Sequence, residues 1–242
     1  MHYMYNRYVS TSDLYKSIAV EILKLANESI KKKGKFTIAL SGGSTPKKLY
    51  KLLATEEYQE KFPWNDTYVF WSDERFVHYN DPKSNYGMVK DVLLNHVPIS
   101  KENIFRVLVS KHNAKHAAAE YELTIKQVLG DQKSLDLVLL GLGLDGHTAS
   151  LFPNSSALKE QKLWVVNVVP KKAVPLLERV SFTLPIINNA SNVFFLVSGR
   201  DKRGIVSEII KSYQKKGAKK YPAALVNPHG ELKWFTDFEL EK

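Results

Sequence analysis

The chain has 242 residues, 44% of them hydrophobic, and its 35 basic against 25 acidic residues give a net charge of +10. This length allows a sizeable core, and residues 1–242 read as a single domain because no linker, repeat or low-complexity stretch divides them. Cysteine is absent, which excludes disulfide bonds, thiolate catalysis and metals held by cysteine.

The first part of the chain predicts a helix, a strand and a polar loop. Ser12 is a fitting N-cap, apolar residues follow it at helical spacing, and Gly34 ends the helix after a run of lysines. Phe36–Leu40 then reads as a buried strand that stops at the Ser41–Thr45 loop. Pro46–Leu53 reads as the next helix, because proline suits a first turn.

The rest of the chain continues this alternation. Further strands are predicted, in chain order, at Thr67–Trp71, Ile104–Val107, Leu135–Leu140, Trp164–Val168, Arg179–Thr183, Asn192–Val197 and Glu231–Phe235. Further helices are predicted at Asn85–Leu94, Asn113–Leu129, Pro185–Ala190 and Lys202–Tyr213. Apolar strands that alternate with helices are typical of an α/β fold, so we expect a doubly wound, mostly parallel sheet flanked by helices.

Polar clusters follow several of these strands. They are Ser41–Thr45, Asp73–Arg75, Gly141–His147 and Gly199–Lys202. Because ligands of parallel α/β sheets bind beyond the carboxyl ends of the strands, we expect these distant segments to meet at one edge of the sheet.

The first cluster has the parts of a phosphate cradle. Gly42, Gly43, Ser44 and Thr45 offer backbone N–H groups and hydroxyls at the start of a helix. The spacing fits neither a Walker A loop nor a dinucleotide fingerprint. An ordinary tight turn with a capping hydroxyl explains the same residues about equally well.

Charged side chains elsewhere are further candidates for binding. Asp73 beside Arg75 can position sugar hydroxyls or bind an anion, although a surface ion pair is the commoner explanation. Arg179 and Lys202 are cationic candidates for a phosphate, and each also fits a surface charge with a buried stem.

The third cluster carries the candidate base. Three glycines surround Asp145 and His147 directly after a buried strand, where the backbone can turn and a ligand can approach closely. Imidazole titrates near neutral pH, so His147 can take a proton from water, and Asp145 can orient it or contact the substrate. A histidine that caps the following turn is the alternative. No second ligand stands at a metal-binding spacing, so we expect no metal.

The basic composition needs no special partner. The lysines occur as scattered pairs and triplets without interleaved aromatics, so we expect a solvated surface that attracts a phosphorylated small molecule, and no nucleic acid. No segment has the apolar length of a membrane span or the look of a signal peptide. We therefore expect no membrane contact, a cytoplasmic location, and a monomer or small homo-oligomer.

Together the motifs closely resemble those of the 6-phosphogluconolactonases over nearly the whole chain. The matching segments are Leu40–Pro46, Asp73–Arg75, Ser84-Asn85, Gly141–Pro153, Arg179–Thr183, Ile187-Asn188, Gly199–Lys202, Pro222–Val226 and Trp234-Phe235. The Gly-Asp-Gly-His-Thr-Ala-Ser-Leu-Phe-Pro string is the most specific of them. The residue before Asp145, often Pro or Glu in that family, is Leu144 here.

The resemblance implies hydrolysis of 6-phospho-D-glucono-1,5-lactone to 6-phosphogluconate, the second step of the oxidative pentose phosphate pathway, without a cofactor. Our hypothesis is that His147 activates water, Asp145 orients its ring, and loop N–H groups or Arg75 stabilise the developing oxyanion. In the same hypothesis, the Gly42–Thr45 loop, Arg179 and Lys202 hold the 6-phosphate.

Two rival functions remain. The glucosamine-6-phosphate deaminases share the Rossmann-like fold and the Gly-x-Asp-Gly-His core, but they continue with Ile-Ala-Phe-Asn-Glu-Pro, whereas this chain has Thr148–Pro153 and lacks that glutamate. A non-catalytic protein that binds sugar phosphates or nucleic acid is the second rival. The intact Asp-Gly-His loop argues against it, because a pure binder needs no base there.

Overall fold

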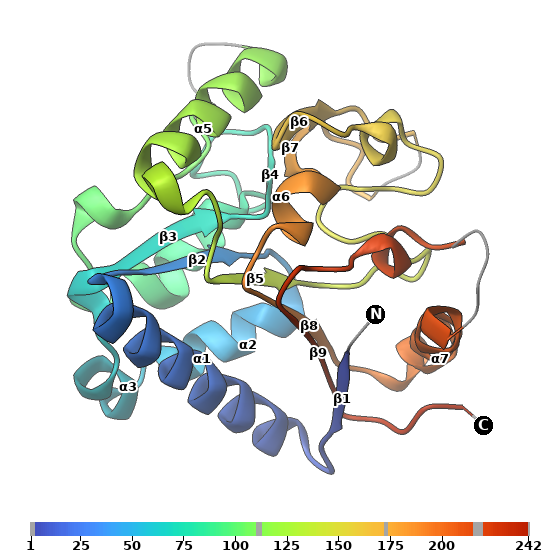
Figure 1. The fold of residues 1–242 in the computed structure, drawn as a ribbon, viewed down its shortest axis with the longest axis horizontal. Coiled ribbons are helices and arrows are strands. Elements are labelled where there is room, and N and C mark those ends of the chain that lie inside the picture. Colours follow the sequence, from blue (N-terminus) through green and yellow to red (C-terminus); the bar gives the residue numbers. More distant parts are fainter. Residues whose placement is uncertain (1–2, 110–112, 172–173, 215–219, 242) are drawn as a thin grey trace.

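A parallel sheet forms the centre of the computed structural model, which describes residues 3–109, 113–171, 174–214 and 220–241 (Figure 1). Its six strands lie in the order β1-β9-β8-β5-β2-β3, and every neighbouring pair is parallel. Their bounds are β1 Met4–Arg7, β2 Phe36–Leu40, β3 Thr67–Trp71, β5 Leu137–Leu140, β8 Asn192–Val197 and β9 Glu231–Thr236. The predicted fold class is confirmed.

Two of the predicted strands belong to a second, antiparallel sheet and not to the parallel one. It has the order β4-β7-β6, with β4 at Asp73–Arg75, β6 at Val165–Val168 and β7 at Arg179–Phe182. The strand predicted at Ile104–Val107 is wrong. Ile104 forms only an isolated bridge to Val69, and Phe105 packs its ring on Phe70 at 5.0 Å.

Helices cover both faces of the parallel sheet (Figure 1). They are α1 Thr11–Lys33, α2 Ser44–Leu53, α3 Glu56–Lys61, α4 Asn85–Val89 with a π-helical continuation Lys90–Leu94, α5 Ala114–Leu129, α6 Leu184–Asn188 and α7 Arg203–Gln214. Single 3-10 turns lie at Trp64–Asp66, Lys101–Asn103, Gly130–Gln132, Ser156–Lys159, Arg200–Lys202 and Pro222–Leu225.

The sequence placed two helix starts slightly late. The N-cap of α1 is Ser10, not Ser12, because the Ser10 hydroxyl accepts the Asp13 N–H at 3.1 Å. Helix α2 begins at Ser44 and not at Pro46, with Gly43 as its N-cap. Two hydroxyl residues of the predicted phosphate loop therefore belong to the first turn of a helix.

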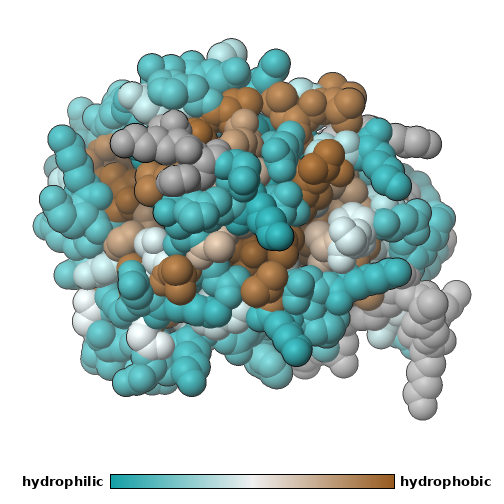
Figure 2. All heavy atoms as spheres, turned by 90° about the horizontal axis from the view of Figure 1, so that it is seen from above, coloured by the Kyte–Doolittle hydropathy of each residue, from teal (hydrophilic) through white to brown (hydrophobic). Residues whose placement is uncertain are grey.

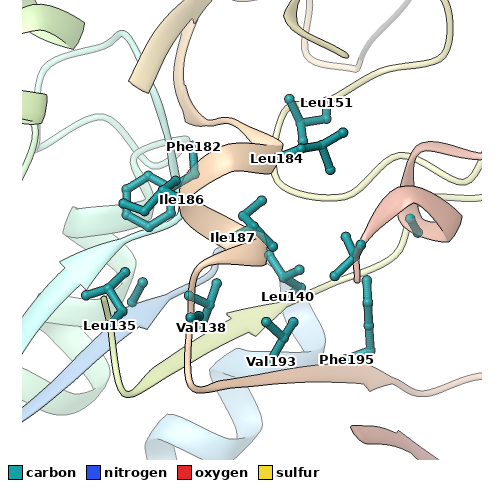
Figure 3. Packing of buried hydrophobic residues seen from close by; sticks show 14 of the residues in the cluster. Leu135, Val138, Leu140, Leu151, Phe182, Leu184, Ile186, Ile187, Val193 and Phe195 are labelled. Atoms are coloured by element: carbon teal, nitrogen blue, oxygen red, sulfur yellow. The ribbon is translucent and has the colours of Figure 1, made fainter. Parts of the chain in front are cut away.

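Alternating side chains of the central strands fill two separate cores. On β5, Leu137 and Leu139 pack with α1 and α2, whereas Val138 and Leu140 pack with α5 and α6. Figure 3 shows Val138 and Leu140 beneath the apolar side of α6, together with residues of β8. Burial on both faces explains why β5 reads as a continuous apolar run.

The sheet reverses its winding between β2 and β5. The chain passes from β2 to β3 on one side, and later adds β5, β8 and β9 on the other. A ligand site of a doubly wound sheet is expected at the carboxyl edge where the winding reverses. The loops after β2 and β5 stand at this place.

The face above α5 and the second sheet carries patches of apolar side chains among polar ones (Figure 2). A groove there is lined by Leu123, Leu163 and Val166. Its one carboxylate, Glu122, accepts the Trp164 and Val165 N–H groups and pairs with Lys126 at 2.5 Å. The carboxylate of this groove is therefore engaged in holding α5 to β6. Among the described residues, no helix is long and apolar enough to cross a membrane.

Candidate active site

A pocket of about 270 Å³ lies at the carboxyl edge where the winding reverses. The loops after β2, β5 and β8 form its wall, together with residues of β4, β7, the end of β8 and the first residue of α4, Asn85. All but one of the residues predicted from the sequence line it, namely Gly42, Gly43, Ser44, Thr45, Asp73, Arg75, His147, Arg179 and Lys202. The remaining one, Asp145, reaches the pocket through its contact with His147.

His147 and Asp145 form a close pair. His147 Nδ1 lies 2.5 Å from Asp145 Oδ1, and the His147 backbone N–H donates to the same oxygen at 3.1 Å. Burial alone would raise the pKa of Asp145, but these hydrogen bonds and the charge of His147 outweigh it and hold the pKa below its usual value. The carboxylate is therefore ionised, and the imidazole faces it instead of capping the following turn.

The backbone and an aromatic ring support this pair. Gly143 donates its N–H to the His147 carbonyl at 2.9 Å, and a Cβ on Gly143 would lie 2.1 Å from His147 Nδ1. The Phe152 ring lies 4.6 Å from the imidazole, and the Arg179 guanidinium lies over its ring at 5.5 Å. A glycine is required at position 143 because the His147 and Asp145 side chains pack directly against its backbone.

The α2 end of the pocket suits an anion. Gly43, the N-cap of α2, has φ 106°, and no side chain among the described residues caps this helix start. Helix N-termini offer backbone donors and a partial positive charge to anions. The loop is fixed from behind, since the Tyr50 hydroxyl accepts the Ser41 N–H at 3.0 Å and donates to the Ser41 carbonyl at 2.8 Å.

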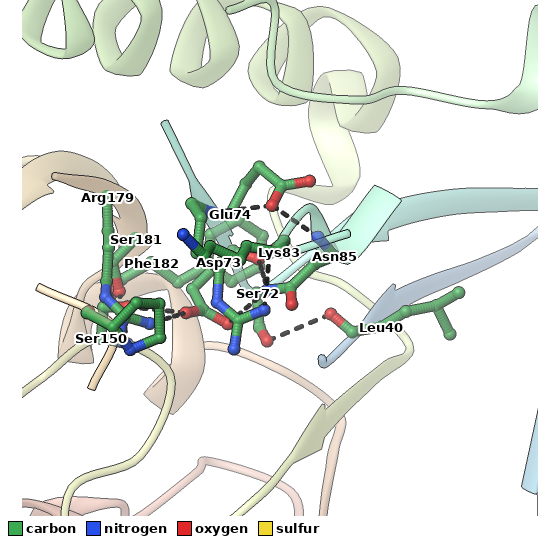
Figure 4. Close-up of polar contacts among 12 residues, drawn as sticks. Leu40, Ser72, Asp73, Glu74, Lys83, Asn85, Ser150, Arg179, Ser181 and Phe182 are labelled. Carbon is green, nitrogen blue, oxygen red and sulfur yellow. Dashed lines mark hydrogen bonds and ion pairs between the residues drawn. The ribbon is translucent and has the colours of Figure 1, made fainter. Parts of the chain in front are cut away.

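Asp73 is a buried carboxylate at the pocket wall, not part of a surface ion pair. Ser150 Oγ donates to its Oδ2 at 2.6 Å, and Asn85 Nδ2 donates to its backbone carbonyl at 2.8 Å and its Oδ1 at 3.3 Å. Arg179 Nη1 lies 3.9 Å from Oδ2. Figure 4 shows the carboxylate between Ser150 and Arg179 on one side and Asn85 on the other.

Three cationic side chains line the same pocket, Arg75, Arg179 and Lys202. Arg179 is 5% exposed, so the reading of it as a surface charge is wrong, and burial lowers its pKa against the opposing effect of Asp73. Burial also lowers the pKa of Lys202, against Asp201 and Asp145. Lys202 Nζ donates to the Leu142 carbonyl, in the loop that follows β5 and carries His147. The net charge of the wall therefore favours an anionic ligand.

Sequence patterns assigned no role to several side chains beside the pocket. Asn85 and Ser150 lay in motifs of the resemblance, but no spacing rule connects either of them with Asp73 across the chain. Phe152 follows His147 by five residues, and its contact depends on a turn that has no periodic signal. Glu74 lies between the two predicted residues Asp73 and Arg75, and its burial follows from the second sheet.

In the part of the chain that the structure describes, no group of three or more His, Asp and Glu side chains is arranged to hold a metal ion.

Comparison with known proteins places the chain in a family. Residues 9–234 match the model described as glucosamine-6-phosphate isomerases/6-phosphogluconolactonase. The chain is 41% identical over 220 residues to a 6-phosphogluconolactonase of Nostoc sp., which covers 89% of this chain and 88% of the relative. The corresponding protein of Synechocystis sp. is 40% identical over 214 residues, 87% of this chain and 85% of its own.

Solved structures agree with this match. A 6-phosphogluconolactonase from Trypanosoma cruzi superposes with a TM-score of 0.85 at 30% identity, over 97% of this chain and 94% of that one. One from Thermotoga maritima gives 0.84 at 27% identity, over 97% and 99%. The chain belongs to the glucosamine-6-phosphate isomerase/6-phosphogluconolactonase family.

Proposed function

We propose that this protein hydrolyses 6-phospho-D-glucono-1,5-lactone to 6-phospho-D-gluconate. The observation that carries the proposal is the His147–Asp145 pair beside a pocket lined by three cations. A base can activate water at the lactone carbonyl, and the cations suit a phosphorylated substrate. The relatives in Nostoc and Synechocystis bear the name of this activity.

The pair suits His147 as the general base. With Nδ1–H donated to the Asp145 carboxylate, Nε2 carries the lone pair that can accept a proton. A water oxygen then attacks C1 of the lactone while Nε2 takes its proton. The C1–O5 bond breaks as the imidazolium returns a proton to the ring oxygen, which leaves the open-chain acid.

The remaining polar groups divide the binding of the substrate. We assign the 6-phosphate to the start of α2, formed by Gly42–Thr45, together with Arg179 and Lys202. Asp73, as a fixed acceptor, suits the sugar hydroxyls. Arg75 or backbone N–H groups of the loops would stabilise the oxyanion that develops at C1.

A lactonase assay on freshly generated substrate, corrected for spontaneous opening, tests the proposal. We expect activity that a chelator leaves unchanged, and no ammonia release from glucosamine 6-phosphate. His147→Ala should lower kcat by about 10²–10⁴-fold with little change in KM. An inactive wild type would refute the proposed reaction, whereas a fully active His147→Ala variant would refute only the base.

We further propose that residues 1–242 act as one domain on this small molecule, as a monomer or small homo-oligomer. The scattered lysines support a function without nucleic acid. The cytoplasm remains the proposed compartment, although a relative from rice is named as chloroplastic.

A further inference from the structure

We propose that Glu74 and Asn85 are positioning residues that act in sequence: Glu74 fixes Asn85, and Asn85 fixes Asp73 in the pocket. The inference rests on the proposed function, in which Asp73 binds the sugar hydroxyls. It assigns a function to Glu74, a buried carboxylate that does not line the pocket.

The second sheet places Glu74 away from the substrate. Side chains of a strand alternate between its faces, so Asp73 and Arg75 point into the pocket and Glu74 points to the other side of β4. Glu74 is only 3% exposed. A carboxylate buried this far needs several donors to offset its lost hydration.

Four donors meet the Glu74 carboxylate. Oε1 accepts the backbone N–H groups of Arg75 and Asn85, both at 2.7 Å. Oε2 accepts the Tyr86 N–H at 2.7 Å and the Ser84 hydroxyl at 3.2 Å. One side chain thus joins β4 to the first turn of α4, and so determines where Asn85 stands.

Asn85 in turn positions Asp73 at the pocket. Its amide must point Nδ2 at Asp73, because the partner at 2.8 Å is a carbonyl oxygen that can only accept. Oδ1 is therefore turned toward Gly42, where a Cβ would lie 1.8 Å from it, and it has no partner among the described residues. The side chain therefore lies between Gly42 and Asp73, at the wall of the pocket.

An unpaired buried oxygen destabilises the folded state, so stability alone does not explain this arrangement. What the amide achieves is geometric. It holds the backbone and Oδ1 of Asp73 from one side, while Ser150 holds Oδ2 from the other. The carboxylate is thereby fixed before the substrate arrives.

Steady-state kinetics of Asn85→Ala and Glu74→Gln test the proposal. Each should lower kcat/KM about 10- to 100-fold, mainly through a higher KM, because Asp73 is misplaced while His147 is untouched. Since the two residues act along one path, the double variant should lose no more than Asn85→Ala alone. Losses that multiply would show independent roles and overturn the sequence of action.

Two matched controls separate positioning from stability. Neither control residue lines the pocket: Glu122 is a buried carboxylate that accepts two backbone N–H groups, and Asn103 is a buried amide that donates to the Asn65 carbonyl at 2.7 Å. Glu122→Gln and Asn103→Ala should lower the melting temperature and leave kcat/KM unchanged. If Glu74→Gln and Asn85→Ala behave like these controls, the proposal is wrong.

Crystal structures keep the two proposals distinguishable. The lactonase assay of the wild type decides the proposed function by itself. In the Asn85→Ala and Glu74→Gln crystals we expect the Asp73 carboxylate displaced and the rest of the sheet unchanged. An Asp73 that keeps its wild-type position in both variants overturns the positioning role, whatever the enzyme's substrate.

Discussion

Asp145 Oδ1 accepts two hydrogen bonds from His147, one from the ring at 2.5 Å and one from the backbone at 3.1 Å. A single carboxylate oxygen thus fixes both the position of the loop and the tautomer of the imidazole. Asp145 is half exposed, so its contribution is orientation more than a strong buried charge. The contact favours the orienting role over direct binding of the sugar.

Asp145→Asn should lower kcat by about 10- to 100-fold and leave KM nearly unchanged, because the amide can turn its NH₂ toward Nδ1 and favour the wrong tautomer. Steady-state rates on fresh lactone measure the effect. A large rise in KM with kcat preserved would instead assign Asp145 to the sugar.

The fold was predictable where burial leaves a local pattern. Continuous apolar runs marked β2, β3, β5 and β8, and the loops that follow them were correctly expected at one edge of the sheet. Strands β6 and β7 were found as strands, but nothing local shows that they pair with each other and with Asp73–Arg75. The choice of partner depends on tertiary contacts.

The site was predictable where residue chemistry and chain position coincide. His147 could be found because glycines flank it after a buried strand. Asn85 could not, because its contact with Asp73 joins the start of a short helix to a strand of another sheet. The same holds for Ser150, which meets Asp73 across 77 residues.

Arg179 and Lys202 should bind the phosphate more than they promote the reaction. Arg179→Ala and Lys202→Ala are each expected to raise KM about 10- to 100-fold, the range of one lost charge-assisted hydrogen bond, with a smaller effect on kcat. Lys61→Ala is the control, since Lys61 is exposed and pairs with Glu57 on α3. If both pocket variants keep the wild-type KM, these cations do not hold the phosphate.

Gly143 is predicted to be necessary for space and not for backbone conformation. Its φ is not in the left-handed region, yet a Cβ would lie 2.1 Å from His147 Nδ1 and 2.7 Å from Asp145 Oδ1. Gly143→Ala should therefore move the imidazole and lower kcat at least about tenfold. Gly204→Ala on α7, where the nearest atom lies 3.7 Å away, should keep full activity. A fully active Gly143→Ala variant would mean that the His147–Asp145 geometry is not needed.

Glu74 should make the stability of the protein depend on pH near neutrality. Burial raises the pKa of Glu74 to about 7, and hydrogen bonds from the Tyr86, Asn85 and Arg75 N–H groups offset this only in part. Between pH 4.5 and 7 the folded state then holds a proton that the unfolded state has released. The free energy of unfolding must fall as the pH rises through this window.

The raised pKa of Glu74 corresponds to a loss of unfolding free energy on the order of 3 kcal/mol by pH 7. This loss is absent from Glu74→Gln, because glutamine cannot titrate. Urea denaturation of both proteins between pH 5 and 7.5 gives the difference in unfolding free energy, in which all other titrating groups cancel. The wild type should lose stability relative to Glu74→Gln as the pH rises. A difference independent of pH would mean that the four donors keep Glu74 ionised throughout this range. A wild type that gains stability relative to Glu74→Gln as the pH rises would mean that the pKa of Glu74 is lowered.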